Sequence, residues 1–217
     1  MRKIFKKLLA ASIAAGSFIF TLPVGNFVSP VYAESRAELS QAEKETLAKQ
    51  KLNEGNALSE QGDYQGAIEK YTEAVELIPN FANAYYNRGL VYDKLKKYEQ
   101  AISDYNKAIE LNSNNATVYQ IRGFAYYRLK QYEAAISDYS KVIEINPNDE
   151  NAYYLRGAFY AEKGNFRQAI ADATKAIQLN PNYVTAYQLR GVCYKNLGET
   201  EKANADFAKA KELGYKN

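Results

Sequence analysis

Residues 82–115 read ANAYYNRGLVYDKLKKYEQAISDYNKAIELNSNN, and this 34-residue pattern recurs along most of the chain. A glycine, which ends the motif Y-x-x-R-G in the last four repeats, and an alanine twelve residues later both return every 34 residues. The glycines are Gly55, Gly89, Gly123, Gly157 and Gly191, and the alanines are Ala67, Ala101, Ala135, Ala169 and Ala203. A fixed period of this length is typical of a solenoid. We therefore expect five repeats, at residues 48–81, 82–115, 116–149, 150–183 and 184–217.

Each repeat is predicted to form two amphipathic helices joined by a short link. In the second repeat, apolar and small residues recur at spacings of three and four over Ala82–Leu95 and again over Glu99–Leu111. Lys96–Tyr98 is expected to be the link between them. Proline cannot continue a helix, and it follows the second helix in three repeats, at Pro79, Pro147 and Pro181. The expected fold class is all-α.

Small residues on both helices are expected to let the two helix backbones of a repeat approach closely. An aromatic residue on the second helix would then fill the space beside them. The residues at this position are Tyr71, Tyr105, Tyr139, Ala173 and Phe207. Ala173 is the exception, so the fourth repeat should contain either a local gap or a larger neighbouring side chain.

The repeats resemble the tetratricopeptide repeat (TPR) family. The third repeat carries the whole set of characteristic residues: Tyr119, Gly123, Tyr126, Ala135, Tyr139, Val142 and Pro147. The resemblance extends over all five repeats and is highly specific. It implies a right-handed α-solenoid of helical hairpins whose first helices line a concave groove. It also implies a non-enzymatic scaffold that binds a protein or an extended peptide.

The resemblance further implies which residues line the groove, because these lie on the first helix and away from its Tyr and Gly core. The amide and aromatic members are Asn53, Asn56, Asn83, Tyr86, Asn87, Gln120, Phe124, Tyr127, Tyr154 and Gln188. Aliphatic residues at matching positions are Leu90, Ile121, Leu155, Ala158, Leu189 and Val192. Amides can hydrogen-bond a peptide backbone as donors and as acceptors, and aromatic rings give rigid contact area. The alternative is that the apolar members only pack against neighbouring helices.

One well-defined groove chemistry of the family, a clamp for a C-terminal carboxylate, matches this chain only in part. Its two asparagine positions correspond to Asn56 and Asn87. Its basic positions fall on Leu52, Thr117 and Ile121, none of which carries a charge. A carboxylate held by amides alone would lack the charge-assisted hydrogen bonds that give most of the affinity. The sequence therefore argues against this clamp.

Charged residues also follow the 34-residue period. An arginine precedes the glycine of the last four repeats, an aspartate follows sixteen residues later, and a lysine three residues after that. The arginines are Arg88, Arg122, Arg156 and Arg190, and the aspartates are Asp104, Asp138, Asp172 and Asp206. The first repeat reverses all three signs, with Glu54, Lys70 and Glu73. We interpret the arginine and aspartate as a pair across the hairpin, supported by the lysine, rather than as a ladder of arginines for an anionic ligand.

The N-terminal 33 residues resemble a secretory signal peptide. They carry four basic residues, then a thirteen-residue apolar stretch over Leu8–Phe20, and Val31-Tyr32-Ala33 fits a cleavage site. We expect export, to the periplasm or out of the cell, with an uncleaved membrane anchor as the alternative. Residues 34–47 are polar and helix-prone. They are expected to form a helix that continues into or packs against the first repeat, or else a flexible spacer.

Removal of this leader would leave 24 basic and 25 acidic residues, a net charge of −1. Such a domain has no electrostatic attraction for nucleic acid. The chain has no histidine and a single cysteine, Cys193, so we expect no metal, no cofactor and no enzymatic activity. Two functions remain: an exported module that binds a protein or peptide in its groove, and a structural adaptor that uses the convex face or the 34–47 helix. The oligomeric state is not predicted.

Overall fold

The computed structural model describes residues 39–215, which contain ten α-helices. In chain order these are α3 (Gln41–Glu60), α4 (Tyr64–Leu77), α5 (Ala82–Lys94), α6 (Tyr98–Leu111), α7 (Ala116–Arg128), α8 (Tyr132–Ile145), α9 (Glu150–Glu162), α10 (Phe166–Leu179), α11 (Val184–Asn196) and α12 (Thr200–Glu212). The signal peptide expected at residues 1–33 lies outside the described residues. No helix within residues 39–215 is long and apolar enough to cross a membrane.

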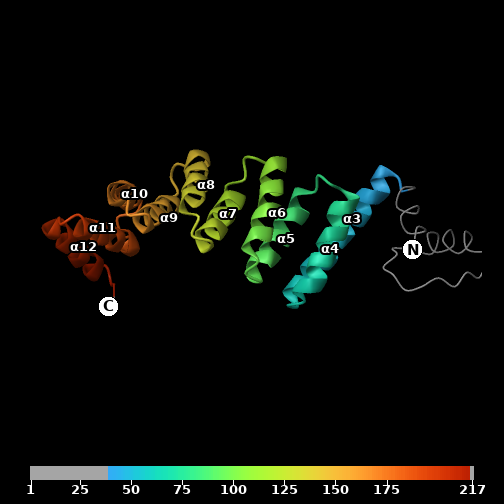
Figure 1. Ribbon diagram of the computed structural model, residues 1–217, viewed down its shortest axis with the longest axis horizontal. Coiled ribbons are helices and arrows are strands. Elements are labelled where there is room, and N and C mark those ends of the chain that lie inside the picture. Colours follow the sequence, from blue (N-terminus) through green and yellow to red (C-terminus); the bar gives the residue numbers. More distant parts are fainter. Residues whose placement is uncertain (1–38, 216–217) are drawn as a thin grey trace, which may run out of the picture. The chain divides into compact units, whose positions relative to one another are not determined.

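The described residues from Gln41 to Tyr215 belong to the larger of two compact units. Within the larger unit the helices pack as hairpins, and each hairpin packs on the next (Figure 1). The odd-numbered helices are the first helices of the repeats and the even-numbered ones are the second. The all-α solenoid predicted from the period is confirmed.

Residues 41–47 continue into the first repeat as a single helix, because α3 runs from Gln41 to Glu60 without a break. Of the alternatives considered for residues 34–47, the structure supports a helix that extends the first helix of the array, over 41–47. The side chain of Ala48, at the expected repeat boundary, is buried. The part of that segment before Leu39 lies outside the described residues.

The link within each repeat contains one residue in the left-handed backbone region. These residues are Gly62, Lys96, Lys130, Gly164 and Gly198, with φ between 58° and 83°, and they are again 34 residues apart. A glycine adopts this conformation without strain, whereas a residue with a Cβ atom does not. Lys96 and Lys130 therefore carry backbone strain that the other three repeats avoid. The second helix begins earlier than expected, since Tyr98 is the first residue of α6.

Replacing Lys96 by glycine should stabilise the protein. The left-handed conformation costs a non-glycine residue about 1–2 kcal/mol, and the greater freedom of glycine in the unfolded chain offsets about half of that gain. We expect the free energy of unfolding to rise by about 0.5–1 kcal/mol in urea titrations followed by circular dichroism. The reverse change at Gly164, to lysine, is the matched control and should destabilise by a similar amount.

The glycine of the first helix gives space to the aromatic ring of the second helix. A Cβ atom built on Gly89 would lie 2.6 Å from Cε1 of Tyr105, and the corresponding distance from Gly191 to Phe207 is also 2.6 Å. Gly55 meets Tyr71 in the same way. At these three glycines the close approach is between a helix backbone and a ring. At Gly157 the backbone oxygen of Ala169 lies 3.3 Å from a built Cβ atom, so there the two backbones approach closely, as predicted.

The fourth repeat has no aromatic ring at this position, and a different side chain fills the space. Ala173 is fully buried, and the side chain of Leu189, from α11 of the next repeat, reaches to 3.4 Å from a Cβ built on Gly157. Of the two expectations for this site, the structure supports a larger neighbouring side chain. The neighbour comes from the next repeat, so the fourth and fifth repeats interlock here.

Each arginine of the last four repeats forms a two-pronged ion pair with the aspartate sixteen residues later. Arg88 donates from Nε and Nη2 to the two oxygens of Asp104 at 2.8 and 2.7 Å, and the other three pairs have the same geometry. The predicted pairing across the hairpin is confirmed. All four aspartates are buried.

The third nitrogen of each arginine binds the preceding repeat, which sequence reasoning did not predict. Nη1 donates to a side-chain oxygen on the second helix of that repeat, namely to Thr72, Asn106, Ser140 and Thr174 in turn. Each guanidinium thus joins its own hairpin to the previous one. The corresponding residue of the last repeat is Ala208, which has no such oxygen.

The lysines do not support the aspartates as expected. Lys107, Lys141 and Lys209 instead form ion pairs with the glutamate three residues later on the same helix. The first repeat, with reversed signs, uses Lys51 as a bridge. This lysine pairs with Glu54 on its own helix and with Glu73 on α4 at 2.9 Å.

Candidate functional site

One residue of each first helix, directly after the buried glycine, lies on a common surface. These residues are Asn56, Leu90, Phe124, Ala158 and Val192, and we call this surface the first-helix face. None of the five is buried, and Phe124 and Val192 are 36% and 46% exposed.

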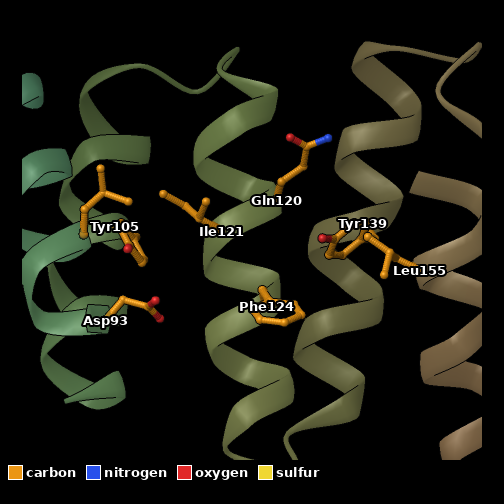
Figure 2. A pocket seen from close by; sticks show the side chains of 8 residues that line it. Asp93, Tyr105, Gln120, Ile121, Phe124, Tyr139 and Leu155 are labelled. Carbon is orange, nitrogen blue, oxygen red and sulfur yellow. The ribbon is translucent and has the colours of Figure 1, made fainter. Parts of the chain in front are cut away.

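A pocket of about 330 Å³ opens on this face between α5, α7 and α9. Figure 2 shows side chains from α5 and α6 on one side of it, from α7 at its centre, and from α8 and α9 on the other side. Its lining residues are Leu90, Asp93, Tyr105, Gln120, Ile121, Phe124, Tyr139 and Leu155. The volume falls at the lower end of the range for small-ligand sites, about 300–1,000 Å³. It suits one or two side chains of a larger partner.

The base of the pocket is formed by two tyrosines of the second helices, Tyr105 and Tyr139. The hydroxyl group of the tyrosine at this repeat position has different partners in different repeats. In the first repeat the Tyr71 hydroxyl donates to Oδ1 of Asn56 at 2.8 Å. One repeat later the residue at the Asn56 position is Leu90, which cannot accept a hydrogen bond. The Tyr105 hydroxyl is consequently buried without any hydrogen-bond partner among the described residues. A buried polar group without a partner in the fold is uncommon and requires an explanation.

Asp93 contributes the only carboxylate among the pocket residues. It lies on α5, one turn beyond Leu90, and Figure 2 shows its carboxylate directed from α5 towards the space beside α7. Burial raises the pKa of Asp93, an effect that the nearby Arg128 guanidinium only partly opposes. Among the described residues, no cation lies within ion-pair distance of Asp93. The carboxylate thus faces the pocket without a bonded partner.

Phe124 is held in place by its neighbours although it is partly exposed. The guanidinium of Arg128 lies 4.8 Å from the centre of its ring, and the ring of Tyr127 lies 5.8 Å away. Tyr127 in turn stacks on the buried Phe159 at 5.0 Å. A ring fixed in this way offers contact area with little loss of side-chain entropy on binding.

The structure brings only part of the predicted groove set together. Gln120 and Phe124 line the pocket described above, along with the aliphatic Leu90, Ile121 and Leu155. Asn83 and Tyr86 line a second hollow of about 230 Å³ between the second and third repeats, beside Asn112 and Asn115.

The remaining predicted residues lie outside both hollows. Asn87 donates to Asn56 at 2.8 Å, so part of the hydrogen-bonding capacity of these two amides is used within the fold. Tyr127 packs on Phe159, Tyr154 packs against Tyr183 at 5.2 Å, Asn53 is exposed on α3, and Gln188 is half-buried on α11.

Sequence reasoning missed Asp93, Tyr105 and Tyr139 as pocket residues. The two tyrosines were assigned to the core, and they are core residues whose hydroxyl ends reach the floor of the pocket. Asp93 occupies a position where the other repeats have Ser59, Tyr127, Ala161 and Lys195. A single carboxylate three residues after a half-buried leucine on the same helix was the available signal.

Among the described residues, no group of three or more Cys, Asp or Glu side chains is arranged to hold a metal ion. Cys193 lies on the packed side of α11 and is fully buried. Burial raises the pKa of its thiol to about 11, so the thiol is protonated at neutral pH. A buried neutral thiol is a weak nucleophile.

The sequence matches known families over most of the array. Two families described as "Tetratricopeptide repeat" match residues 82–115 and 150–183, and 104–137 and 173–203. A family described as "TPR repeat" matches residues 55–96 and 123–164. No curated protein shows significant sequence similarity to the chain.

Solved structures of similar chains agree with these matches. A crystal structure of MamA is 30% identical, with a TM-score of 0.70, and covers 73% of this chain and 93% of its own. A second MamA structure is 28% identical, with a TM-score of 0.73, and covers 77% and 91%. YrrB, described as a TPR protein with an unusual peptide-binding site, is 27% identical, with a TM-score of 0.69, and covers 76% and 84%.

The chain belongs to the tetratricopeptide repeat family. It is an α-helical scaffold with a role in protein interaction. Proteins with this architecture are typically non-catalytic.

Proposed function

We propose that the chain binds an extended segment of a partner protein along the first-helix face, with the pocket between α5, α7 and α9 at the centre of the contact. The observation that carries this proposal is the pocket itself, which has apolar walls and a buried hydroxyl without a partner. The similarity to YrrB, a TPR protein with a peptide-binding site, supports it.

An extended segment suits this surface because its side chains alternate in direction. One side chain can enter the pocket while the backbone on either side of it crosses α5 and α9. Polar groups for that backbone are available at the rim. Nε2 of Gln120 is already bonded to Asp149 at 3.1 Å, which leaves its oxygen to accept from a backbone N–H. Asn83, in the neighbouring hollow, can pair with a second peptide group.

The test is selection of twelve-residue peptides from a random display library on the immobilised full-length chain. The variant Leu90→Ser with Phe124→Ser removes two apolar side chains from the pocket. The matched control, Leu95→Ser with Leu197→Ser, removes two exposed apolar side chains that lie outside it. We expect the first double variant to lose at least about 10-fold in affinity for selected peptides, and the control to lose little.

Peptides that bind both double variants as tightly as the wild-type chain would contradict the proposal. The binding site would then lie elsewhere, as in an adaptor that uses the opposite face or the N-terminal part of α3. A selection that enriches no peptide binding to the wild-type chain would argue against recognition of linear segments altogether.

We also propose that this binding takes place outside the cytoplasm, in the envelope or in secretion. The support is the pattern of residues 1–33, with a basic start, an apolar stretch and a cleavage motif at Val31–Ala33. N-terminal sequencing of the protein isolated from its native cell should find Glu34 as the first residue. A chain that retains Met1 would contradict cleavage and favour an anchor.

A further inference from the structure

The pocket on the first-helix face is rich in hydrogen-bond acceptors and carries a single formal charge. The acceptors are the Asp93 carboxylate, the Tyr105 and Tyr139 hydroxyl oxygens, and Oε1 of Gln120. No lysine or arginine is among the eight lining residues. The pocket is therefore complementary to a group that donates hydrogen bonds and carries positive charge.

The positions of the Asp93 carboxylate and of the unpaired Tyr105 hydroxyl also favour a ligand with a cationic hydrogen-bond donor. Burial raises the pKa of the Tyr105 phenol, and the charge of the nearby Asp93 carboxylate raises it further. Tyr105 is fully buried and its hydroxyl has no partner within residues 39–215. A cationic donor placed between the two would satisfy both groups at once.

The walls suit a long apolar stem that leads to such a donor. Leu90 of α5 and Ile121 of α7 line the pocket with aliphatic side chains, and Phe124 adds an aromatic ring. Lysine and arginine side chains have this form, because they bury their methylene groups along apolar surface and end in a charge. Aromatic rings also attract a cation placed over their faces.

We propose that this pocket binds a lysine or arginine side chain of the partner segment, with its stem between Leu90, Ile121 and Phe124 and its charged end at Asp93 and the Tyr105 hydroxyl. The inference rests on the proposed function and names the chemistry of its ligand: an extended peptide with a basic residue at one fixed position.

An acidic or a purely apolar side chain fits the same pocket less well. An acidic one would be repelled by Asp93 and would find only neutral donors, namely hydroxyl groups and the Gln120 amide. The guanidinium of Arg128, which partly opposes the effect of burial on Asp93, lies 4.8 Å from the centre of the Phe124 ring and is exposed. An apolar one would leave Asp93 and the Tyr105 hydroxyl desolvated without a partner, which is costly.

The stability of the free protein separates a binding role of Asp93 from a structural one. Because burial raises its pKa, folding favours the protonated form, and the ionised carboxylate at neutral pH works against folding. Asp93→Asn should therefore leave the urea midpoint unchanged or raise it. The matched control is Glu162→Gln, which removes one exposed carboxylate from the end of α9, outside the pocket.

The experiment compares peptide selection on the full-length wild-type chain, Asp93→Asn, Glu162→Gln and the pocket double variant. We expect the wild-type chain and Glu162→Gln to enrich lysine or arginine at one position beside apolar residues. Asp93→Asn should lose that preference. A selected lysine peptide should bind the wild-type chain about 10- to 100-fold more tightly than its norleucine analogue, and Asp93→Asn should bind the two alike.

Three results would overturn the inference, and they have different meanings. Enriched peptides without a basic preference, or a preference that Asp93→Asn retains, would reject the basic-residue pocket and leave peptide binding in place. A lower urea midpoint for Asp93→Asn than for Glu162→Gln would assign Asp93 to the fold. Enrichment that the pocket double variant does not reduce would overturn both this inference and the proposed function.

Discussion

Replacing Asp138 by alanine should lower the free energy of unfolding by about 3 kcal/mol, the lower end of the range for breaking a buried ion pair. The side chain of Asp138 is 4% exposed, and both of its oxygens accept hydrogen bonds from Arg122. Its loss would leave the guanidinium, which is 16% exposed, with Asn106 as its hydrogen-bond partner. Urea titration followed by circular dichroism measures the change.

Two further variants show whether the effect belongs to the pair. Glu144→Ala removes a 67%-exposed partner of Lys141 and should cost less than about 0.5 kcal/mol. Arg122→Ala combined with Asp138→Ala should cost clearly less than the sum of the two single changes, with a coupling of at least about 1 kcal/mol. Additive effects would mean that Arg122 and Asp138 contribute independently, contrary to the structure.

Reversing the charges of the Arg122–Asp138 pair should recover only part of the stability that either single change costs. The sign reversal in the first repeat suggests a larger recovery. Arg122 also donates to Asn106 and lies 5.5 Å from the centre of the Tyr119 ring, and a glutamate at this position could do neither. The first repeat works with reversed signs because Lys51 bridges Glu54 and Glu73. The other repeats have tyrosine at the Lys51 position.

Gly89→Ala should destabilise the protein by about 2 kcal/mol, whereas Gly157→Ala should change its stability little. At Gly89 the new methyl group would lie 2.6 Å from the ring of Tyr105, which is fully buried. At Gly157 the nearest atoms are Cβ of Asp172 at 3.1 Å and the backbone oxygen of Ala169 at 3.3 Å, contacts that are longer than the ring contact at Gly89, and no ring is present because the second helix carries Ala173.

The higher helix propensity of alanine adds about 1 kcal/mol in favour of both variants, so the comparison isolates the packing term. Urea titrations of the two proteins under the same conditions provide the measurement. Equal destabilisation at both positions would mean that the ring does not determine the need for glycine. A repeat with alanine at the ring position would then tolerate the replacement of its first-helix glycine no better than the other repeats.

The period allowed the fold to be predicted from the sequence, because every repeat places the same residues in the same local contacts. The Arg–Asp pairs followed from their spacing and from the reversed signs of the first repeat. Two local features did not follow. Lys96 and Lys130 adopt positive φ without a glycine to mark the turn. The oxygen that accepts from each arginine belongs to a different residue type in successive repeats, so no motif marks it.

The pocket was harder to predict than the fold, because it depends on differences between repeats rather than on their similarity. Leu90 in place of Asn56 leaves the Tyr105 hydroxyl without an acceptor, and Asp93 has no acidic counterpart in the other repeats. The family pattern identified the first-helix face and therefore included Gln120 and Phe124. It could not show that Asn56 and Asn87 bond to each other.

The most direct test of the central claim is to map a bound peptide by NMR. A selected peptide is added to the ¹⁵N-labelled chain, and the shifts of backbone amides are followed. Binding at the proposed site predicts the largest changes at Leu90, Asp93, Phe124 and Leu155. Changes confined to the opposite surface around Ser103 and Lys107, where Tyr85 and Glu110 line a separate hollow, would contradict it.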